Sequence, residues 1–551
     1  MRKFYIHLPP GARSDIPIAS LRSQIIAAMG MTATGPAAKI LVEIDGPIGK
    51  LIEFEAPDVA AAGMKIAGLP VRESPIYEAQ YLKREDIVAI KAAGMTFDEK
   101  VSIQLMDNMK LLGFDEIWAD PDFGGGRGLE FFVIDTGIDN SDKRFGDRIL
   151  EVWASPGIGG ALHWHATWVA SIIGRNRGVY DYGQDYRGGC FNCSYYDIRV
   201  LDGNGQGSMG TVAWGINKAI EINRAKPSRI PRIINMSLGG MHEDSMDQIT
   251  NLARSEGILV IVAAGNSGTN QRPCDNTLMC PADAQKAIGT GATSGAHGTQ
   301  GPPENPKQEQ VQDWSSRNPA QIGPTETRYE KRYVVAPGLG IRTSADGQVA
   351  SGTSGARPMN ATSNGATIHR LARVHPDWTS TQILEKDEEI LFRKCLNLGY
   401  DGSPKYPPDP TLGHDDPGQP YRCLQGYGRV QAGEMYKEAA GGGNGGPTNE
   451  IVKVEFYLDT KLFDTLTTPT QGTVYKKEAP GLSEDVWHEV HGIAYDKQGN
   501  TGESDQVMFK VKKGSQPTKV VCRVNSPTPN QEFDPGSTVT LEIEAYVEKP
   551  V

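Results

Sequence analysis

The chain has 551 residues, enough for three or four domains of ordinary size. Its 56 Lys and Arg against 67 Asp and Glu give a formal charge of −11, and an acidic chain without a basic patch argues against nucleic-acid binding. The longest apolar run, residues 257–265, has the length of a strand, so no membrane span is expected. These features predict a globular protein with a substantial buried core.

Residues 1–80 predict a small α/β unit. Strand and helix patterns follow one another in the order β-α-β-β-α-β, at residues 2–8, 18–29, 38–45, 49–56, 58–68 and 69–77. This order is typical of a ferredoxin-like unit. The mixed and charged residues 81–115 are expected to connect this unit to the next domain.

Residues 116–440 predict an α/β domain. Apolar strand patterns alternate with amphipathic helix patterns, the strands at 129–135, 195–202, 232–238 and 258–265 and the helices at 165–174, 211–222 and 245–255. Such alternation predicts βαβ units, and hence a parallel sheet with helices on both faces.

The last part of the chain is expected to be all-β. A glycine-rich linker at 441–449 precedes residues 450–515, whose alternating runs between turn residues are typical of a β-sandwich. Residues 516–551 look like the start of a further β module. This module ends before a second sheet could be completed, so we expect the chain to be a fragment.

Seven cysteines indicate disulfide bonds and an extracytoplasmic location, although the N-terminus lacks the apolar core of a signal peptide. The expected local pairs are Cys190 with Cys193, Cys274 with Cys280, and Cys395 with Cys423, which leaves Cys522 over. An alternative is a zinc site formed by the first two pairs, although the spacing of the second pair is poor for zinc ligands.

Three polar side chains lie where predicted elements begin or end. Asp135 ends a buried strand, at the edge where parallel sheets build their sites. His165 opens one helix, and Ser354 opens another after a glycine-rich approach. These residues fit an orienting carboxylate, a general base and a nucleophile. The alternatives are a cap or turn at Asp135, a helix-start or metal-binding histidine, and an N-cap at Ser354.

Asn266 follows the strand 258–265 at its carboxyl end. Its side-chain amide and the backbone N–H of Ser354 could both donate to a developing oxyanion, and such a donor contributes about 3–4 kcal/mol. The alternative is a turn residue before Ser-Gly.

Four motifs together resemble the subtilisin-like serine proteases: DTGID at 135–139, HATWVASIIG at 165–174, AAGNSG at 263–268 and GTSGARP at 352–358, in the family's order. The resemblance covers about residues 110–440. It implies the subtilisin-like α/β fold and peptide-bond hydrolysis through an acyl-enzyme.

The resemblance implies a role for each reacting residue. Asp135 orients, His165 is the base, Ser354 is the nucleophile and Asn266 is the oxyanion donor. His165 rather than His163 is the base, because the VAS-x-x-G after it matches the family's VAG-x-x-G.

The resemblance also implies a cleft that clasps an extended peptide as an added strand, where glycines let the substrate backbone approach closely. The implied substrate-binding residues are Gly205, Gln206, Gly207, Ser237, Leu238, Gly239, Gly240, Ala264 and Gly265.

Three residues depart from the family's pattern. Trp168 stands where a non-catalytic His is usual, and Gly355 and Arg357 lie in a segment that is usually Met-Ala-Ser/Thr-Pro. None of them removes a reacting group, so they bear on the shape of the pocket. They also motivate the alternative of a catalytically degenerate binding or adhesion scaffold.

The two ends carry weaker resemblances. Residues 1–80, with the ending LPVRESPIYEAQ, resemble the inhibitor-type propeptides of the family, and a processing junction is expected within 76–105. Residues 450–515 resemble immunoglobulin-like modules of secreted bacterial enzymes. The implied partners are polypeptide substrates and the chain's own propeptide. The chemistry needs no cofactor; the family often binds structural Ca²⁺, but the sequence assigns no ligands for it.

Overall fold

The computed structural model describes most of the chain between residues 2 and 548. The described residues are 2–10, 16–30, 39–56, 64–66, 69–92, 103–141, 143–176, 178–181, 184–268, 277–297, 309–317, 320–322, 328–330, 332–343, 349–396, 398, 422–441, 451–458, 461–466, 487–496, 501–503, 507–510, 519–526 and 542–548. They divide into two compact units, Met1–Tyr436 and Lys437–Val551.

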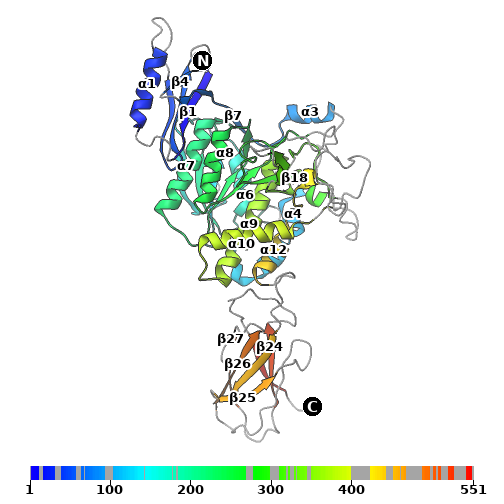
Figure 1. Ribbon diagram of the computed structural model, residues 1–551. Helices are drawn as coiled ribbons and strands as arrows, with labels where there is room; N and C mark the ends of the chain where they lie inside the picture. The colour runs from blue at the N-terminus through cyan, green and yellow to red at the C-terminus, as the bar shows by residue number, and fades with distance from the viewer. Residues whose placement is uncertain are drawn as a thin grey trace. The chain divides into compact units, whose positions relative to one another are not determined.

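A seven-stranded parallel sheet is the centre of residues 103–436, which we call the main domain (Figure 1). The strand order is β10-β13-β9-β15-β17-β18-β21, and every neighbouring pair is parallel. The strands are β9 (Glu130–Asp135), β10 (Ile149–Ala154), β13 (Ser194–Arg199), β15 (Ile233–Met236), β17 (Leu259–Ala263), β18 (Ile288–Thr293) and β21 (Tyr333–Pro337). The predicted α/β fold with a parallel sheet is confirmed.

Helices cover this sheet in two groups. In one group α6 (His165–Gly174) packs on α9 (Thr353–Val374), which also contacts α10 (Ser380–Lys394). In the other, α7 (Met209–Ala225) packs on α8 (Asp244–Ser255). Cover on both faces explains why the central strands are apolar at successive residues rather than at alternate ones.

Shorter elements complete the main domain and the connection that precedes it. They are α3 (Arg84–Ala92), β8 (Ile103–Gln104), α4 (Leu105–Leu111), α5 (Phe114–Ala119), η1 (Pro121–Phe123), β11 (Gly178–Asp181), β12 (Gln184–Tyr186), β14 (Gln206–Ser208), β16 (Leu238–Gly240), η2 (Gly295–His297), β19 (Ala320–Ile322), β20 (Arg328–Glu330), β22 (Ile341–Arg342), β23 (Val349–Ala350), α11 (Arg422–Gln425) and α12 (Ala432–Ala439).

Residues 2–73 form a four-stranded antiparallel sheet with a helix, which we call the N-terminal unit. Its elements are β1 (Arg2–Leu8), α1 (Ile18–Gly30), β2 (Lys39–Gly46), β3 (Gly49–Ala56), β4 (Lys65–Ile66), β5 (Leu69–Pro70) and β6 (Arg72–Glu73). The sheet order is β2-β3-β1-β6. The first helix and the first three strands match the prediction. The second predicted helix is wrong at its end, where Lys65 and Ile66 form β4; residues 57–63 lie outside the described residues.

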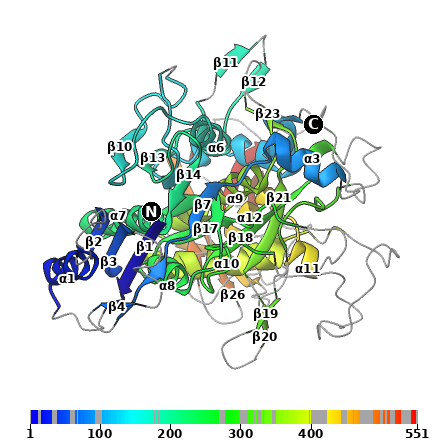
Figure 2. The same cartoon turned by 90° about the horizontal axis from the view of Figure 1, so that it is seen from above.

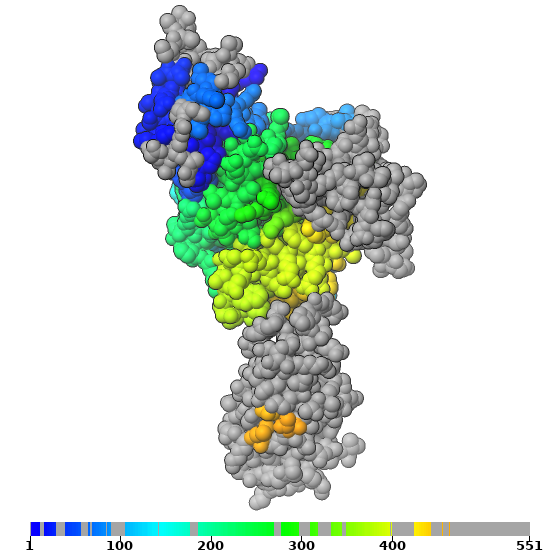
Figure 3. Space-filling view, in the orientation of Figure 1, coloured from blue at the N-terminus to red at the C-terminus, as the bar shows by residue number. Residues whose placement is uncertain are grey.

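The two faces of the N-terminal sheet are buried against different partners. One face packs on α1 and forms a separate core that includes Phe4, Ile6 and Phe54. The other face adds Tyr5 and Leu51 to the large core beneath α7 and α8. Alternate residues of one strand therefore serve two cores, as the pleat of a strand requires. Figure 3 shows the blue N-terminal unit lying directly against the green surface of the main domain.

Residues 76–82, which we call the crossing segment, leave the N-terminal unit and run over the main domain. They contain β7 (Ile76–Ala79), which is the middle strand of the small sheet β14-β7-β16 and is antiparallel to both neighbours. Figure 2 shows β7 beside β14. The end of the predicted strand 69–77 is thus shifted into this separate sheet.

The second unit is all-β where it is described. Its strands are β24 (Ile451–Leu458), β25 (Lys461–Leu466), β26 (Trp487–Asp496), β27 (Thr501–Glu503), β28 (Val507–Lys510), β29 (Lys519–Ser526) and β30 (Glu542–Glu548). The first five form one antiparallel sheet in which β28 also pairs with β26, and β29 pairs with β30. The sandwich arrangement itself stays a prediction.

The predicted disulfide between Cys190 and Cys193 is wrong, because both are free, buried thiols. They point to different neighbours: Cys190 accepts a hydrogen bond from the Thr362 hydroxyl (3.1 Å), whereas Cys193 packs against Gly174. Cys280 and Cys395 are also free, so the other two predicted bridges fail as well. Cys274 lies outside the described residues, and nothing is described of the side chains of Cys423 and Cys522.

No helix in the described part of the chain has both the length and the apolar character that a membrane crossing needs.

Candidate active site

Asp135 and His165 form a buried pair at the carboxyl edge of the parallel sheet. Asp135 ends β9 and His165 begins α6, and Nδ1 of His165 lies 2.8 Å from Oδ1 of Asp135. The same carboxylate oxygen accepts the backbone N–H of Thr136 (2.7 Å), and both side chains are fully buried. This bond fixes the imidazole orientation and leaves Nε2 as the nitrogen able to take a proton.

Ser354 lies in the first turn of α9. Its hydroxyl donates to the backbone carbonyl of Ser237 at 3.0 Å, and no partner within the described residues bonds to Nε2 of His165. Consecutive residues of the chain contact the two: the Gln80 carbonyl oxygen accepts the Ser354 N–H, and the Tyr81 ring centroid lies 5.5 Å from that of His165.

Asn266 follows β17 and faces the start of α9. Its Oδ1 accepts the backbone N–H of Thr353 (3.0 Å) and the Thr353 hydroxyl (3.1 Å). These two bonds fix the amide so that its NH₂ group is the part left to donate. The structure thus pairs Asp135 with His165 and places Asn266 beside Thr353, the residue directly before Ser354.

The backbone of the crossing segment pairs with both predicted clasp edges. In β14, Gln206 and Gly207 face Glu78 and Tyr77, and in β16, Leu238 and Gly239 face Ala79 and Glu78. The Ala79 N–H also donates to the Gly205 carbonyl (2.9 Å). Glycine is needed at 207 because a Cβ there would meet the Val200 carbonyl oxygen. Seven of the nine predicted substrate-binding residues, 205–207 and 237–240, line this strand or bond to Gln80.

Gln80 places a peptide bond directly at Ser354. Its N–H donates to the Ser237 carbonyl (2.9 Å), and its carbonyl oxygen accepts the backbone N–H of Ser354 (3.0 Å). Beyond it, the Leu82 N–H donates to the Ser351 carbonyl (2.8 Å). Main-chain bonds therefore hold the chain on both sides of the Gln80–Tyr81 bond.

The Gln80 side chain is buried beside β16. Its amide Nε2 donates to the carbonyls of Gly239 (3.2 Å) and Glu78 (3.0 Å). Met279 fills the adjoining space, since a Cβ at Gly239 would lie 3.0 Å from Met279 Cβ and one at Gly265 would lie 2.6 Å from its sulfur. The remaining predicted cleft residues, Ala264 and Gly265, follow β17, and Gly265 is beside Met279.

Two of the three departures from the family pattern, Trp168 and Gly355, are in contact with each other. A Cβ at Gly355 would lie 2.8 Å from the Trp168 ring and 2.8 Å from Ile341 Cδ1. Trp168 is buried, and its indole N–H donates to the Ile341 carbonyl (3.2 Å). The large ring at 168 therefore requires the absence of a side chain at 355, directly after Ser354.

The third departure, Arg357, is a fully buried cation under the site. Its Nε donates to the Ser237 hydroxyl (3.0 Å) and its Nη1 to the Ile261 carbonyl (3.1 Å). Burial holds the pKa of Arg357 well below its usual value. Ser237 is thereby fixed between Arg357 and Ser354.

A buried carboxylate joins the N-terminal unit to the main domain. Glu53 of β3 is fully buried, accepts the Ser208 hydroxyl (2.6 Å) and accepts the Gly210 N–H (3.1 Å) at the start of α7. It also accepts the hydroxyl of Ser74. A carboxylate at a helix N-terminus is stabilised by the free N–H groups and the dipole there.

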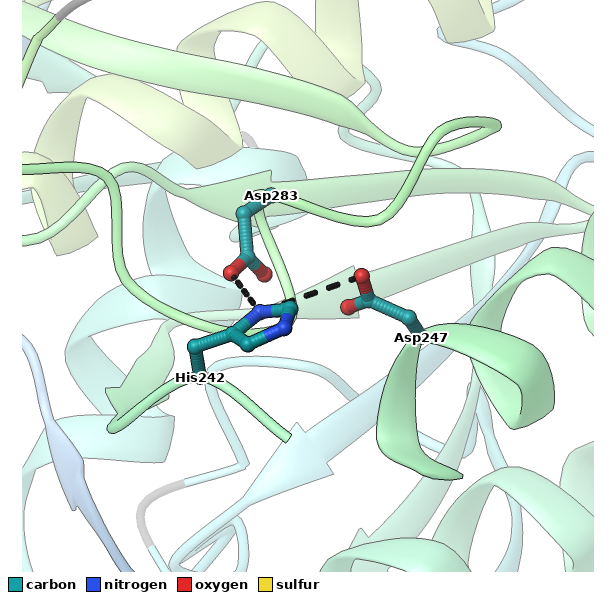
Figure 4. A group of neighbouring side chains, drawn as sticks. All are labelled: His242, Asp247 and Asp283. Carbon is teal, nitrogen blue, oxygen red and sulfur yellow. Dashed lines mark hydrogen bonds and ion pairs between the residues drawn. The ribbon is translucent and has the colours of Figure 1, made fainter. Parts of the chain in front are cut away.

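One group of side chains in the described part of the chain has the ligand types of a cation site. Ligand atoms of His242, Asp247 and Asp283 lie within 4.8 Å of one another (Figure 4). His242 Nδ1 is 2.7 Å from Asp283 Oδ2, and its Nε2 is 3.2 Å from Asp244 Oδ1. Although partial burial works against it, the Asp283 hydrogen bond and the nearby carboxylates raise the pKa of His242. The hydrogen bonds of the His242 ring with Asp283 and Asp244 account for the group without a cation.

Sequence reasoning missed Gln80, Tyr81, Trp164 and Met279 as parts of the site. A signal for the first was present, since the quoted ending LPVRESPIYEAQ stops at Gln80. Met279 carried no signal, because the described structure alone brings it beside Gly239 and Gly265.

Comparison with known proteins agrees with this geometry. The family model described as "Subtilase family" matches residues 126–383. The main domain belongs to the subtilase family. Similar curated proteins include an extracellular serine proteinase of Thermus sp. (strain Rt41A), 35% identical over 172 residues. Serine protease AprX of Bacillus subtilis (strain 168) is 29% identical over 229 residues, and Proteinase T of Parengyodontium album is 32% identical over 176 residues.

The matches to these subtilases are partial on both sides. They cover 31%, 39% and 31% of this chain, and 37%, 47% and 55% of the Thermus, Bacillus and Parengyodontium proteins respectively. The N-terminal unit and the second unit lie outside the residues that the family model matches.

Proposed function

We propose that the chain is a subtilisin-like serine endopeptidase whose own N-terminal unit occupies its cleft, and that Gln80–Tyr81 is the first bond it cleaves. The observation that carries this proposal is the 3.0 Å hydrogen bond from the Ser354 N–H to the Gln80 carbonyl oxygen. An N–H that already binds this oxygen can also stabilise the charge that develops on it.

The proposed reaction proceeds through an acyl-enzyme. His165 Nε2 takes the Ser354 hydroxyl proton while Oγ attacks the Gln80 carbonyl carbon, and Asp135 stabilises the resulting imidazolium. The oxyanion accepts from the Ser354 N–H and the Asn266 NH₂ group. His165 then gives its proton to the Tyr81 amine as the peptide bond breaks, and water, deprotonated by His165, hydrolyses the ester. No cofactor takes part.

The proposed substrates are extended polypeptides. The pairing of β7 between β14 and β16 supports this, because main-chain bonds of that kind accept many sequences. On this proposal residues 205–207, 237–240 and 264–265 bind substrate. The side chain of the residue before the cleaved bond would lie beside β16 and Met279, where Gln80 lies here.

The N-terminal unit is proposed to act as an inhibitor, consistent with its place in the chain and with the shared core under α7 and α8. The processing junction expected within residues 76–105 is proposed to be the bond between residues 80 and 81. We also propose secretion, since the similar Thermus protein is named as extracellular. The second unit is proposed as an appended immunoglobulin-like module.

The full chain tests the proposal. Wild type, Ser354→Ala and the matched control Ser363→Ala, another serine of α9, would be followed by mass spectrometry and by labelling with a fluorophosphonate probe. Wild type and Ser363→Ala should yield fragments 1–80 and 81–551 and then label. Ser354→Ala should remain intact and unlabelled, a loss of at least about 1,000-fold.

A folded wild-type chain that neither cleaves itself nor labels would overturn the proposal and leave a binding scaffold. Cleavage at another bond would retain the enzyme but exclude the assigned junction.

A further inference from the structure

Aromatic rings gather on the side of the cleft that follows the Gln80–Tyr81 bond. The Tyr81 ring centroid lies 4.9 Å from that of Trp164, edge to face, and 5.6 Å from that of His163. It also lies 5.5 Å from the His165 ring, and the Tyr81 hydroxyl is 3.4 Å from His163 Nε2. These separations are in the range of favourable aromatic pairs.

His163 and Trp164 are held by the main domain. They directly precede His165 in the chain, and Trp164 packs edge to face on the buried Trp168 at 6.0 Å. Both remain half-buried with Tyr81 against them. When Tyr81 leaves after cleavage, these two rings would be the walls that the next substrate meets.

The two sides of the bond are recognised differently. Before the bond, β7 is held by backbone pairing with β14 and β16. Backbone pairing depends little on which side chains the paired strand carries. After the bond, the first backbone bond to the main domain is that of Leu82, whereas the side chain at position 81 contacts the rings of His163, Trp164 and His165. Side-chain contacts of this kind select for residue type.

We propose that His163 and Trp164 form a binding site for an aromatic side chain directly after the cleaved bond, so that the enzyme prefers peptides with Tyr, Phe or Trp at that position. The inference rests on the proposed function and adds its substrate class. The aromatic residue belongs to the leaving amine. Its contact with the His165 ring holds that amine near the group that must protonate it.

A double-mutant cycle within the full chain tests the site, using the rate at which the bond between residues 80 and 81 is cut. Tyr81→Phe should be cut within about twofold of wild type, because the rings remain. Tyr81→Ala should be cut about five- to tenfold more slowly, the size of a lost aromatic contact. Trp164→Ala should slow the wild-type chain by a similar factor but should not slow the Tyr81→Ala chain further. The matched control Leu162→Ala alters an exposed neighbour and should leave the rate unchanged.

Each outcome has one meaning. Non-additive effects of Tyr81→Ala and Trp164→Ala would establish the site. Equal rates for wild type and the Tyr81→Ala variant, or effects that simply multiply, would overturn it, since a structural role of Trp164 slows every chain alike. If the wild-type chain cuts no bond at all, the proposed function fails. If the bond is cut at a rate that does not depend on residue 81, only this inference fails.

Discussion

The seven-stranded sheet of the main domain and the four-stranded sheet of the N-terminal unit are completed in different ways. Helices of the same domain cover the larger sheet. The smaller sheet has its own helix α1 on one face and borrows α7 and α8 of the main domain for the other. A sheet with one unpaired apolar face is marginal by itself. The N-terminal unit therefore owes much of its order to the main domain, whose helices complete its core.

The main domain should therefore tolerate loss of the contact better than the N-terminal unit does. The contact itself has three kinds of parts: a shared apolar core, the buried Glu53 at the start of α7, and an exposed ion pair between Arg72 and Glu243. Substitutions in these parts should affect the N-terminal unit, whereas one substitution within the main domain should affect only that domain.

Glu53→Ala should have the largest effect on the N-terminal unit. It leaves the Ser208 hydroxyl and the Gly210 N–H buried without their acceptor, which costs about 2–3 kcal/mol, or roughly 30- to 150-fold in the opening equilibrium. The measurement is hydrogen exchange of β1 and β3 amides in a Ser354→Ala chain, where the junction stays intact. Exchange in β9 and β15 should not change.

Glu55→Ala is the matched control for Glu53→Ala. Glu55 lies in the same strand, is half-buried and makes no hydrogen bond to α7 within the described residues. Equal protection of β1 in both variants would show that Glu53 does not hold the unit.

The sequence predicts the main domain, which its own helices complete, better than it predicts the contacts between the main domain and the N-terminal unit. The motifs around Asp135, His165, Asn266 and Ser354 could be read directly, because each lies where a predicted element begins or ends: Asp135 and Asn266 at the ends of apolar strands, His165 and Ser354 at the starts of helices. The parallel sheet followed from its alternating pattern. These are local signals, and local signals suffice where a domain is completed by its own elements.

Contacts between distant segments could not be read in this way. In the sequence Glu53 looks like an ordinary glutamate of a strand, and only the structure shows that it accepts the Gly210 N–H at the start of α7. The local pairing expected for Cys190 and Cys193 failed, because each thiol packs against a different distant segment. Trp168 and Gly355 looked like independent departures from a pattern, and only their contact shows that one requires the other.

Gly355→Ala should have an effect confined to the main domain. The added Cβ would lie 2.8 Å from the Trp168 ring, and overpacking of this kind costs about 1–3 kcal/mol. We expect the self-cleavage rate to fall about tenfold as Ser354 is displaced, a factor equal to about 1.4 kcal/mol. The exchange protection of β1 and β3 should stay unchanged, which is the reverse of the Glu53→Ala result.

Trp168→Phe supplies the rescue for Gly355→Ala, since the smaller ring removes the Trp168 contact of the added Cβ and leaves only that with Ile341 Cδ1, the end of a flexible side chain. Recovery of most of the rate in the double variant would support the contact. A double variant as slow as the product of the two single effects would contradict it.

Arg72→Ala should have the smallest effect. Arg72 Nη1 lies 2.8 Å from Glu243 Oε1, but the arginine side chain is 43% exposed, and exposed pairs contribute at most about 1 kcal/mol. Glu243 also keeps its role at the start of α8, where its carboxylate accepts the Ser245 N–H. Opening of the N-terminal unit should therefore rise less than about fivefold, and the difference should vanish in high salt. The control Arg22→Ala removes an ion pair inside the N-terminal unit, 3.9 Å from Glu43, and should not change opening measurably. If Arg72→Ala instead exceeded Glu53→Ala, charges at the rim rather than the buried face would hold the unit, and the N-terminal sheet would have to be complete without its borrowed helices.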